Sequence, residues 1–283
     1  MLDGTFLERP DTHRHITARE ELLDGRELPG LELSPVVAES RRFPEAAADA
    51  LTAQLTTHGL GLVQLDEPLA DERFLALGRL LGTAMPETDP TVQPYVERGV
   101  ILNLLSEHDR TGDVALQPFA TNYLSLHTEG SGRPPAEQPR YIVLMCHDPG
   151  DATSARTVLV PMRAVARAMD PASLDTLSRV RYRHDARLAP IVRYDDGRCV
   201  FTFRDFLDQP LRWTSHGPAD EQTVNDAIAD LLRAMYSAAS AASVHWRAGL
   251  VVVIDNRFFF HGRTAGPAVA SAHRRHLRRL RIV

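Results

Sequence analysis

Three residues in this sequence could together hold a metal ion. His127 and Glu129 stand two positions apart in Asn122-Tyr-Leu-Ser-Leu-His-Thr-Glu-Gly, which predicts a short strand whose alternate side chains leave the same face. His261 follows a second, strongly apolar strand that begins at Gly249. Two histidines and one carboxylate on a β scaffold form the facial triad that binds non-haem Fe(II) and leaves positions open for other ligands. A His-x-Glu pair is common by chance, so it is the combination that indicates a metal site.

The C-terminal stretch from His273 to Arg281 is rich in arginine and could bind carboxylates. A basic run also occurs in arms that bind nucleic acid, but the leucines that interrupt it here and the formal charge of −5 favour a strand in a folded domain. On a strand, Arg275 and Arg279 share a face and lie roughly 13 Å apart. The two guanidiniums could then bind two different carboxylates, one on a cosubstrate and one on a substrate. An internal Asp or Glu is the alternative partner for Arg279.

Other polar residues near these strands could contact a small molecule. Thr157 lies in a predicted strand, where threonine is also an ordinary residue. Gln117 and Asn122 stand in the segment that leads into the His127 strand, and we expect them to face the far end of a substrate. Asp205 could accept a basic or polar group of that substrate, and so could Asp208, although a solvated loop acid is the alternative for both.

The composition is that of a folded protein with reduced cysteines and a sizeable core. The chain has 283 residues, 43% of them hydrophobic, and its two cysteines provide no disulfide framework. No apolar run is long enough to span a bilayer, and the N-terminus lacks the pattern of a signal peptide. We therefore expect a cytoplasmic protein with no membrane partner and a single domain over residues 1–283. Residues 1–40 are expected to form an N-terminal surface segment, with an edge strand at 31–37.

Helices and many short strands follow one another without the regular βαβ pattern of a parallel sheet. This indicates a mainly β (α+β) fold, a barrel or sandwich whose mouth holds the metal. A double-stranded β-helix (jelly roll) core with flanking helices is one such solution. The patterns predict helices at 44–55, 71–81, 161–169, 172–177 and 218–239, and strands at 61–65, 100–105, 141–146, 156–160, 180–183, 191–194, 199–204, 249–254, 258–261 and 276–283.

These residues resemble the Fe(II)/2-oxoglutarate dioxygenases, in particular the clavaminate synthase-like branch of the taurine dioxygenase superfamily. The resemblance covers about residues 55–283. The branch uses His-x-Glu where the wider superfamily more often has His-x-Asp. The matching pieces are Leu126-His-Thr-Glu, Leu144-Met-Cys, Ala155-Arg-Thr-Val, Ile254-Asp-Asn-Arg, His261-Gly-Arg and the arginine run.

The resemblance implies an enzyme that uses Fe(II), 2-oxoglutarate and O2, with the iron on the three residues of the triad. Arg275, fourteen residues after the distal histidine, would bind the far carboxylate of 2-oxoglutarate together with Thr157, or with Thr153 if the register differs. Arg279, four residues later, would hold the carboxylate of the substrate.

The substrate implied by the resemblance is an amino acid or an amino-acid-derived small molecule, hydroxylated at an unactivated carbon, often C3, in specialised metabolism. Glu129 fits hydroxylation, because a halogenase of this type needs a small residue at that position. Desaturation or cyclisation by the same enzyme class stays open, as does a non-catalytic, cupin-like metal-binding protein. Gly130-Ser-Gly-Arg after the triad and Thr264-Ala-Gly after His261-Gly-Arg depart from the branch, so we expect a different lid and substrate pocket. The sequence predicts neither the oligomeric state nor whether the substrate is free, peptide-linked or carrier-bound.

Overall fold

The largest sheet of the protein has seven strands in the order β2-β3-β14-β7-β16-β5-β4. The computed structural model describes residues 1–25, 27–113, 116–151, 155–183 and 187–283. Neighbouring strands of this sheet are antiparallel except β2 and β3. The strands are β2 (Val36–Ala38), β3 (Leu60–Leu65), β14 (Leu250–Asp255), β7 (Tyr141–Asp148), β16 (His276–Ile282), β5 (Ile101–Leu105) and β4 (Val96–Glu97).

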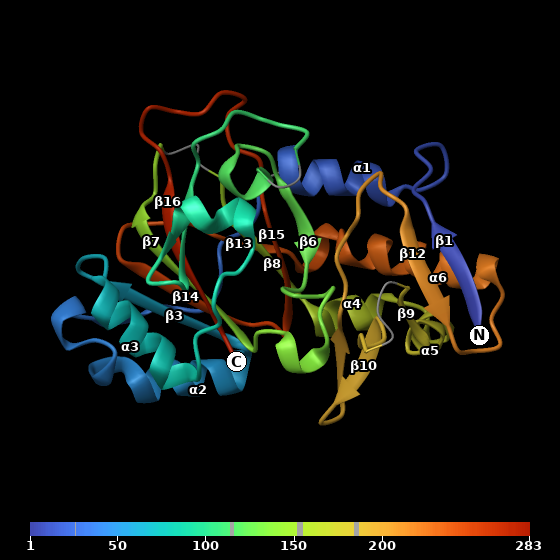
Figure 1. The fold of residues 1–283 in the computed structure, drawn as a ribbon, viewed down its shortest axis with the longest axis horizontal. Coiled ribbons are helices and arrows are strands. Elements are labelled where there is room, and N and C mark those ends of the chain that lie inside the picture. Colours follow the sequence, from blue (N-terminus) through green and yellow to red (C-terminus); the bar gives the residue numbers. More distant parts are fainter. Residues whose placement is uncertain (26, 114–115, 152–154, 184–186) are drawn as a thin grey trace.

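Both faces of the seven-stranded sheet are buried. On one face, Val143 and Met145 of β7 pack with α2 (Ala48–His58) and α3 (Asp71–Leu81), which lie along the sheet in Figure 1. On the other face, Leu144 packs toward the second sheet. Because successive strand residues point to opposite faces, a strand that is buried on both sides needs an unbroken apolar run. This requirement explains the continuous hydrophobic stretches that form β7 and β14.

The second sheet has four antiparallel strands in the order β13-β8-β15-β6. It carries both histidines of the predicted metal site, because β15 pairs with β6 so that His261 lies directly opposite His127. Leu159 of β8 packs toward the large sheet, whereas Val160 joins the core that contains α6 (Glu221–Met235). One face of this sheet therefore meets the large sheet and the other meets helices. The strands are β13 (Ala242–Val244), β8 (Thr157–Pro161), β15 (Phe259–Arg263) and β6 (Leu124–His127).

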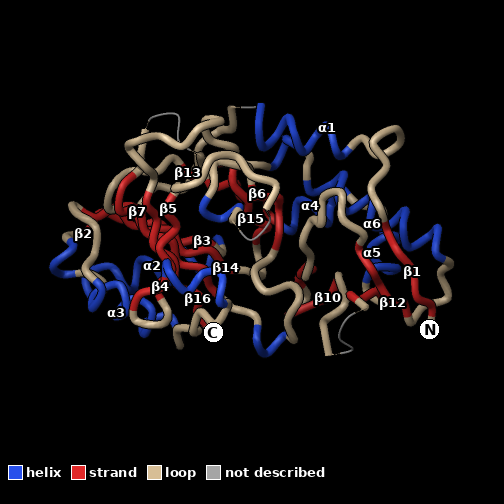
Figure 2. The backbone as a smooth tube through the Cα atoms, turned by 45° about the horizontal axis from the view of Figure 1, so that its top comes forward, coloured by secondary structure: helices blue, strands red, loops and turns tan. Residues whose placement is uncertain are grey.

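The N-terminal residues are part of the fold and not only a surface segment. β1 pairs with β12, and β12 pairs with β9, on the side of the molecule opposite the large sheet (Figure 2). Leu22 and Leu23 are 1% and 0% exposed. The expectation that residues 1–40 lie on the surface is therefore wrong for these parts, and the edge strand expected at 31–37 is limited to the short β2 at Val36–Ala38. The remaining strands and α-helices are β1 (Leu2–Phe6), β9 (Val180–Tyr182), β10 (Val192–Asp195), β11 (Arg198–Phe201), β12 (Leu211–Ser215), α1 (His15–Glu20), α4 (Met162–Ala168) and α5 (Pro171–Leu177).

Most of the predicted elements are present, with ends shifted by a few residues. α3 has the predicted bounds, and α6 begins later than predicted because the side chain of Asp220 caps it by accepting from the backbone N–H of Thr223. The sequence did not predict β1, β12 or β13, which are short and are paired with strands distant in sequence. Within the described ranges, no helix combines the length and the apolar character needed to cross a lipid bilayer.

A buried ion pair anchors the N-terminal segment to the strand that carries His127. Nε of Arg19 donates to Oδ2 of Asp205 at 2.7 Å, and both side chains are almost fully buried. The hydroxyl of Tyr236 donates to the same oxygen at 2.6 Å and accepts from the backbone N–H of Leu126 at 3.1 Å. Burial raises the pKa of Asp205, and the charge of Arg19 opposes that rise. The guanidinium of Arg19 also pairs with Glu8, so removing Asp205 would leave Arg19 with one of its two acids and Tyr236 without its acceptor.

Replacing Asp205 with alanine is expected to destabilise the protein by about 1 to 3 kcal/mol, because Arg19 keeps only Glu8 as its counter-ion and the buried hydroxyl of Tyr236 loses its acceptor. The free energy of unfolding from a denaturant titration measures the loss. Asp24→Ala is the control, since Asp24 forms an exposed pair with Arg110 at 2.9 Å and such pairs contribute about 0 to 1 kcal/mol. Equal losses in the two variants would contradict the anchoring role of the buried pair.

Candidate active site

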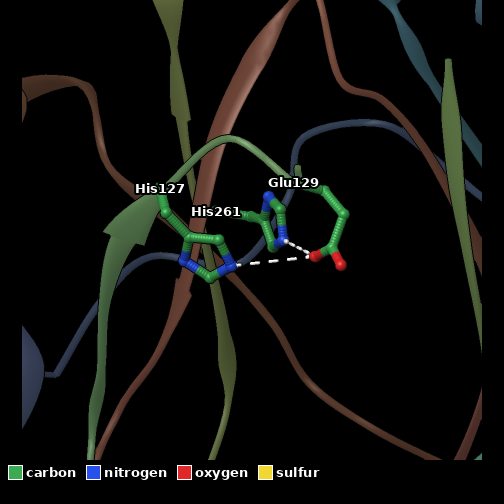
Figure 3. A group of neighbouring side chains, drawn as sticks. All are labelled: His127, Glu129 and His261. Atoms are coloured by element: carbon green, nitrogen blue, oxygen red, sulfur yellow. Dashed lines mark ion pairs between the residues drawn. The ribbon is translucent and has the colours of Figure 1, made fainter. Parts of the chain in front are cut away.

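The three predicted metal ligands come together where β6 and β15 pair (Figure 3). Nε2 of His261 lies 3.7 Å and Nε2 of His127 lies 3.9 Å from Oε2 of Glu129. These separations are longer than hydrogen bonds, so the three donor atoms surround a common point instead of bonding to one another. All three ligand atoms lie within 4.8 Å of one another, as expected of a group that could hold a metal ion.

The imidazole of His127 is in the form that a metal requires. Its Nδ1 donates to the carbonyl of Ser125 at 2.8 Å, which leaves the lone pair on Nε2, the nitrogen that faces Glu129. Burial, together with the neighbouring His261, lowers the pKa of His127 to about 3. The side chain is therefore neutral at physiological pH, as a metal ligand must be. His261 is 8% exposed, and its Nδ1 has no hydrogen-bond partner among the described residues.

Glu129 lies just beyond the end of β6 and is held in place by Asn256. Oδ1 of Asn256 accepts from the backbone N–H of Glu129 at 2.9 Å, and its Nδ2 donates to the Glu129 carbonyl at 3.0 Å. Gly130 follows with a φ of 72°, a left-handed conformation that favours glycine. Burial raises the pKa of Glu129, but the charge of Arg279 and the nearby histidines outweigh it and hold the pKa well below its usual range. The carboxylate is therefore ionised.

The arginines of β16 alternate between the two faces of the large sheet, as predicted for a strand. Arg279 and Arg281 point toward the metal site, with their Nη1 atoms 3.4 and 3.6 Å from Oε1 of Glu129. Arg278 points to the opposite face, where it pairs with Glu97 at 2.8 Å. The arginine run is thus a central strand of a sheet and not a basic arm.

Arg275 is a buried cation with no carboxylate partner in the described part of the chain. It is 4% exposed, its Nη1 donates to the carbonyl of Ala155 at 3.2 Å, and its Nε has no partner there. Burial lowers the pKa of Arg275 to about 10. The residue lines a small cavity of about 30 Å³ together with Thr121 and Gly266. Because an isolated buried charge is unfavourable, this guanidinium favours an anionic ligand.

Thr157 begins β8 and lies opposite Arg263 of β15. Leu159, two residues further along β8, lies opposite His261, so Thr157 shares the face of the sheet from which that histidine projects. The side chain is buried, at 5% exposure, which fits a contact inside the protein. Thr153, the alternative for this role, lies outside the described residues.

Arg279 already has an internal carboxylate partner. Its Nη2 donates to Oε1 of Glu87 at 2.9 Å, and Nη2 of Arg281 donates to Oε2 of Glu87 at 2.7 Å. The sequence left two partners open for Arg279, a substrate carboxylate and an internal Asp or Glu. The structure contains the internal acid, Glu87. Sequence reasoning missed Glu87 because it lies 192 residues from Arg279, and no periodic pattern connects them.

The predicted substrate residues Gln117, Asn122 and Asp205 bond to other parts of the protein. The backbone carbonyls of Gln117 and Asn122 both accept from Nη2 of Arg263 at 2.7 Å. The side chain of Asn122 pairs with the backbone N–H and carbonyl of Thr111. Asp205, expected to contact the substrate, is instead the buried partner of an arginine described above. The sequence of a loop does not show which internal donor a polar side chain will bond to. A substrate contact and an internal hydrogen bond could therefore not be distinguished from the sequence of these residues.

Residues 26–281 match the model of the family described as "Taurine catabolism dioxygenase TauD, TfdA family". The chain belongs to this family. It is therefore a 2-oxoglutarate-dependent dioxygenase that uses Fe(II), 2-oxoglutarate and O2, and the alternative of a non-catalytic, cupin-like protein is wrong. No curated protein matches the chain.

Solved structures of Fe/2-oxoglutarate oxygenases share the fold of this TauD/TfdA family member. PvcB from Pseudomonas aeruginosa is 26% identical with a TM-score of 0.60, over 91% of this chain and 83% of PvcB. PvcB is described as an Fe, alpha-ketoglutarate dependent oxygenase from an isonitrile synthetic pathway. Asparagine oxygenase with Fe(II), 2S,3S-3-hydroxyasparagine and succinate is 14% identical, with a TM-score of 0.62 over 86% of this chain and 81% of its own. OrfP with Fe, succinate and (3S)-hydroxy-L-Arg is 18% identical, with a TM-score of 0.62 over 86% of this chain and 82% of OrfP.

Replacing His127 or His261 with alanine is expected to abolish Fe(II) binding, because only two of the three donors of a facial site remain. Iron content per chain after anaerobic loading measures the effect. His276→Ala is the control, since His276 also lies beside another histidine, with its ring centroid 4.8 Å from that of His147, but is hydrogen-bonded to Asn103. Full iron loading of either triad variant would contradict the site.

Proposed function

We propose that the protein hydroxylates an unactivated carbon, C3, of an amino acid or an amino-acid-derived small molecule in specialised metabolism. The observation that carries this proposal is the convergence of His127, Glu129 and His261 around one point. Two imidazole nitrogens and one carboxylate are the donor set of a facial Fe(II) site, and they leave further positions for other ligands. Two structurally similar oxygenases were solved with products hydroxylated at C3, of asparagine and of arginine, which supports the choice of substrate and carbon.

Arg275 and Thr157 are proposed to hold the far carboxylate of 2-oxoglutarate. Arg275 is suited to this role because it is buried, charged and without a carboxylate partner among the described residues. The pairing of a guanidinium with a carboxylate supplies parallel, charge-assisted hydrogen bonds. The hydroxyl of Thr157, on the face of the small sheet from which His261 projects, can add one further hydrogen bond.

Bound Fe(II) supplies the oxidation itself, in which O2 and 2-oxoglutarate give succinate and CO2 while one oxygen atom enters a C–H bond of the substrate. The chain contributes the geometry around that reaction. Asn256 fixes the backbone of Glu129, the Ser125 carbonyl fixes the tautomer of His127, and the cations of β16 keep Glu129 ionised. The apolar layer between the two sheets excludes water from the inner side of the site.

The seven-stranded and four-stranded sheets are proposed to form a double-stranded β-helix (jelly roll) with the metal site at its mouth. Support comes from the layer of apolar side chains that the two sheets share, including Leu144 and Leu159. The strands that bear the ligands belong to the smaller sheet, and the strand that bears the arginines belongs to the larger one. Residues 1–283 are proposed to act as one domain, because the N-terminal strand and Leu22 join the same core as β8.

The proposed reaction is tested by incubating the Fe(II)-loaded protein with 2-oxoglutarate, O2 and a panel of amino acids and their derivatives. Succinate formation that depends on a panel member identifies a substrate. The product then distinguishes the outcomes, since hydroxylation adds one oxygen atom whereas desaturation and cyclisation remove hydrogen and add none.

Arg275→Ala is expected to raise the 2-oxoglutarate concentration needed for half-maximal succinate formation by roughly 10- to 100-fold, because charge-assisted hydrogen bonds are lost. The amino acid concentration needed should change far less. Arg274→Ala is the matched control, because Arg274 borders the same cavity but is half-exposed and interacts with Glu107 at 3.4 Å. An effect of Arg274→Ala as large as that of Arg275→Ala would contradict the assignment.

A further inference from the structure

Glu87 is an acid that Arg279 and Arg281 share in addition to Glu129. Each of its carboxylate oxygens accepts from one guanidinium, at 2.9 Å from Arg279 and 2.7 Å from Arg281. Its side chain is 3% exposed. Both oxygens are thus engaged by charged donors inside the protein, which is the strongest class of hydrogen bond available to a carboxylate.

The backbone around Glu87 is fixed to the rest of the protein. Its N–H donates to the carbonyl of Gly99 at 3.0 Å, and its carbonyl accepts from Nε2 of Gln93 at 2.6 Å. Upstream, the N–H of Met85 donates to the carbonyl of Arg281 at 2.8 Å, so the segment before Glu87 runs alongside β16. The carboxylate is therefore held in place by the fold and is not carried on a free loop.

Both terminal nitrogens of Arg279 already face internal carboxylates, which leaves only Nε without a partner in the described structure. Its Nη2 bonds to Glu87, its Nη1 lies 3.4 Å from Glu129, and its Nε is buried from solvent without a partner. Bidentate recognition of a carboxylate requires two adjacent N–H groups on one edge. Arg281 is occupied in the same way, with Nη2 on Glu87 and Nη1 3.6 Å from Glu129.

The charges of the four side chains alone balance, and with Fe(II) bound at Glu129 the two arginines would still share Glu87 as their counter-ion. Two arginines face two glutamates, in contrast to Arg275, which has no acidic partner in the described residues. An incoming carboxylate would have to displace Glu87 and leave it buried without its cations, which is strongly unfavourable. An uncharged group of a substrate would not need to displace Glu87 from the two arginines.

We infer that Glu87 determines substrate specificity by occupying the position in which Arg279 would otherwise bind a carboxylate. The amino-acid-derived substrate then presents a masked carboxyl group, an amide or an ester, at this position and not a free carboxylate. The inference rests on the proposed function for its site, and it narrows the substrate to a derivative whose acid group has been condensed with an amine, alcohol or thiol.

The first test uses the metal-free protein and acetate as the probe. Glu87→Ala removes the internal carboxylate, and millimolar acetate should then raise the midpoint of thermal unfolding by occupying the vacated site. The matched control is Glu97→Ala, which removes the acid beside Arg278 on the other face of the same strand. Sodium chloride at the same ionic strength controls for screening, and any binding of acetate at Arg275 is common to wild type and both variants.

We expect acetate to stabilise Glu87→Ala more than wild type or Glu97→Ala. An acetate effect no larger in Glu87→Ala than in Glu97→Ala would overturn the inference. If Glu87→Ala does not fold, Glu87→Ser also vacates the carboxylate position while keeping a polar side chain, and acetate binding to the folded variant is measured by calorimetry with the same expected order. This arm needs neither iron nor turnover, so it separates a failure of the inference from a failure of the proposed function.

The second test compares acids with their amides in the anaerobic complex with Fe(II) and 2-oxoglutarate. The probes are L-arginine with L-argininamide and L-asparagine with L-asparaginamide. Binding of each probe is measured by the change that it causes in the visible absorption band of the complex. Wild type should bind an amide at least about tenfold more tightly than its acid, and Glu87→Gln should reduce or reverse that preference. Tighter binding of the free acids by wild type would overturn the assigned substrate class.

Discussion

The site depends on keeping one carboxylate charged inside the protein. Glu129 must be ionised to act as a metal ligand, yet burial alone favours its neutral form. The arginines of β16 solve this problem, because they bring two positive charges within 3.4 and 3.6 Å of one of its oxygens and leave the other for the histidines. The arginines of the large sheet thus keep Glu129 ionised, whereas the other two metal ligands, His127 and His261, lie on the small sheet.

The same strand presents cations in two different electrostatic states. Arg275 is buried without an acidic partner in the described structure, whereas Arg279 shares two acids with Arg281. A buried charge that lacks a counter-ion favours an anionic ligand, and one that is already paired disfavours it. Two arginines four residues apart can therefore differ in function, because what surrounds each guanidinium decides whether it is available.

The network around Asp205 holds the metal strand from its other side. Tyr236 connects this acid to the backbone of β6, and Arg19 brings in the N-terminal segment. The N-terminal residues are therefore tied to the strand that carries His127, although they contribute no ligand to the metal site. Stability and the geometry of the site are linked through this contact.

The sequence by itself determined the metal triad, the faces of β16 and most of the element positions, because each depends on local patterns. Strand periodicity places alternate side chains on one face, and continuous apolar runs mark strands buried on both sides. Only the tertiary structure decided which charges meet. Glu87 lies 192 residues from Arg279, Asp205 lies 186 from Arg19, and β1 pairs with a strand near residue 213. No periodic pattern encodes such contacts, since they arise when distant segments pack and each buried charge finds the counter-ion that the fold brings to it.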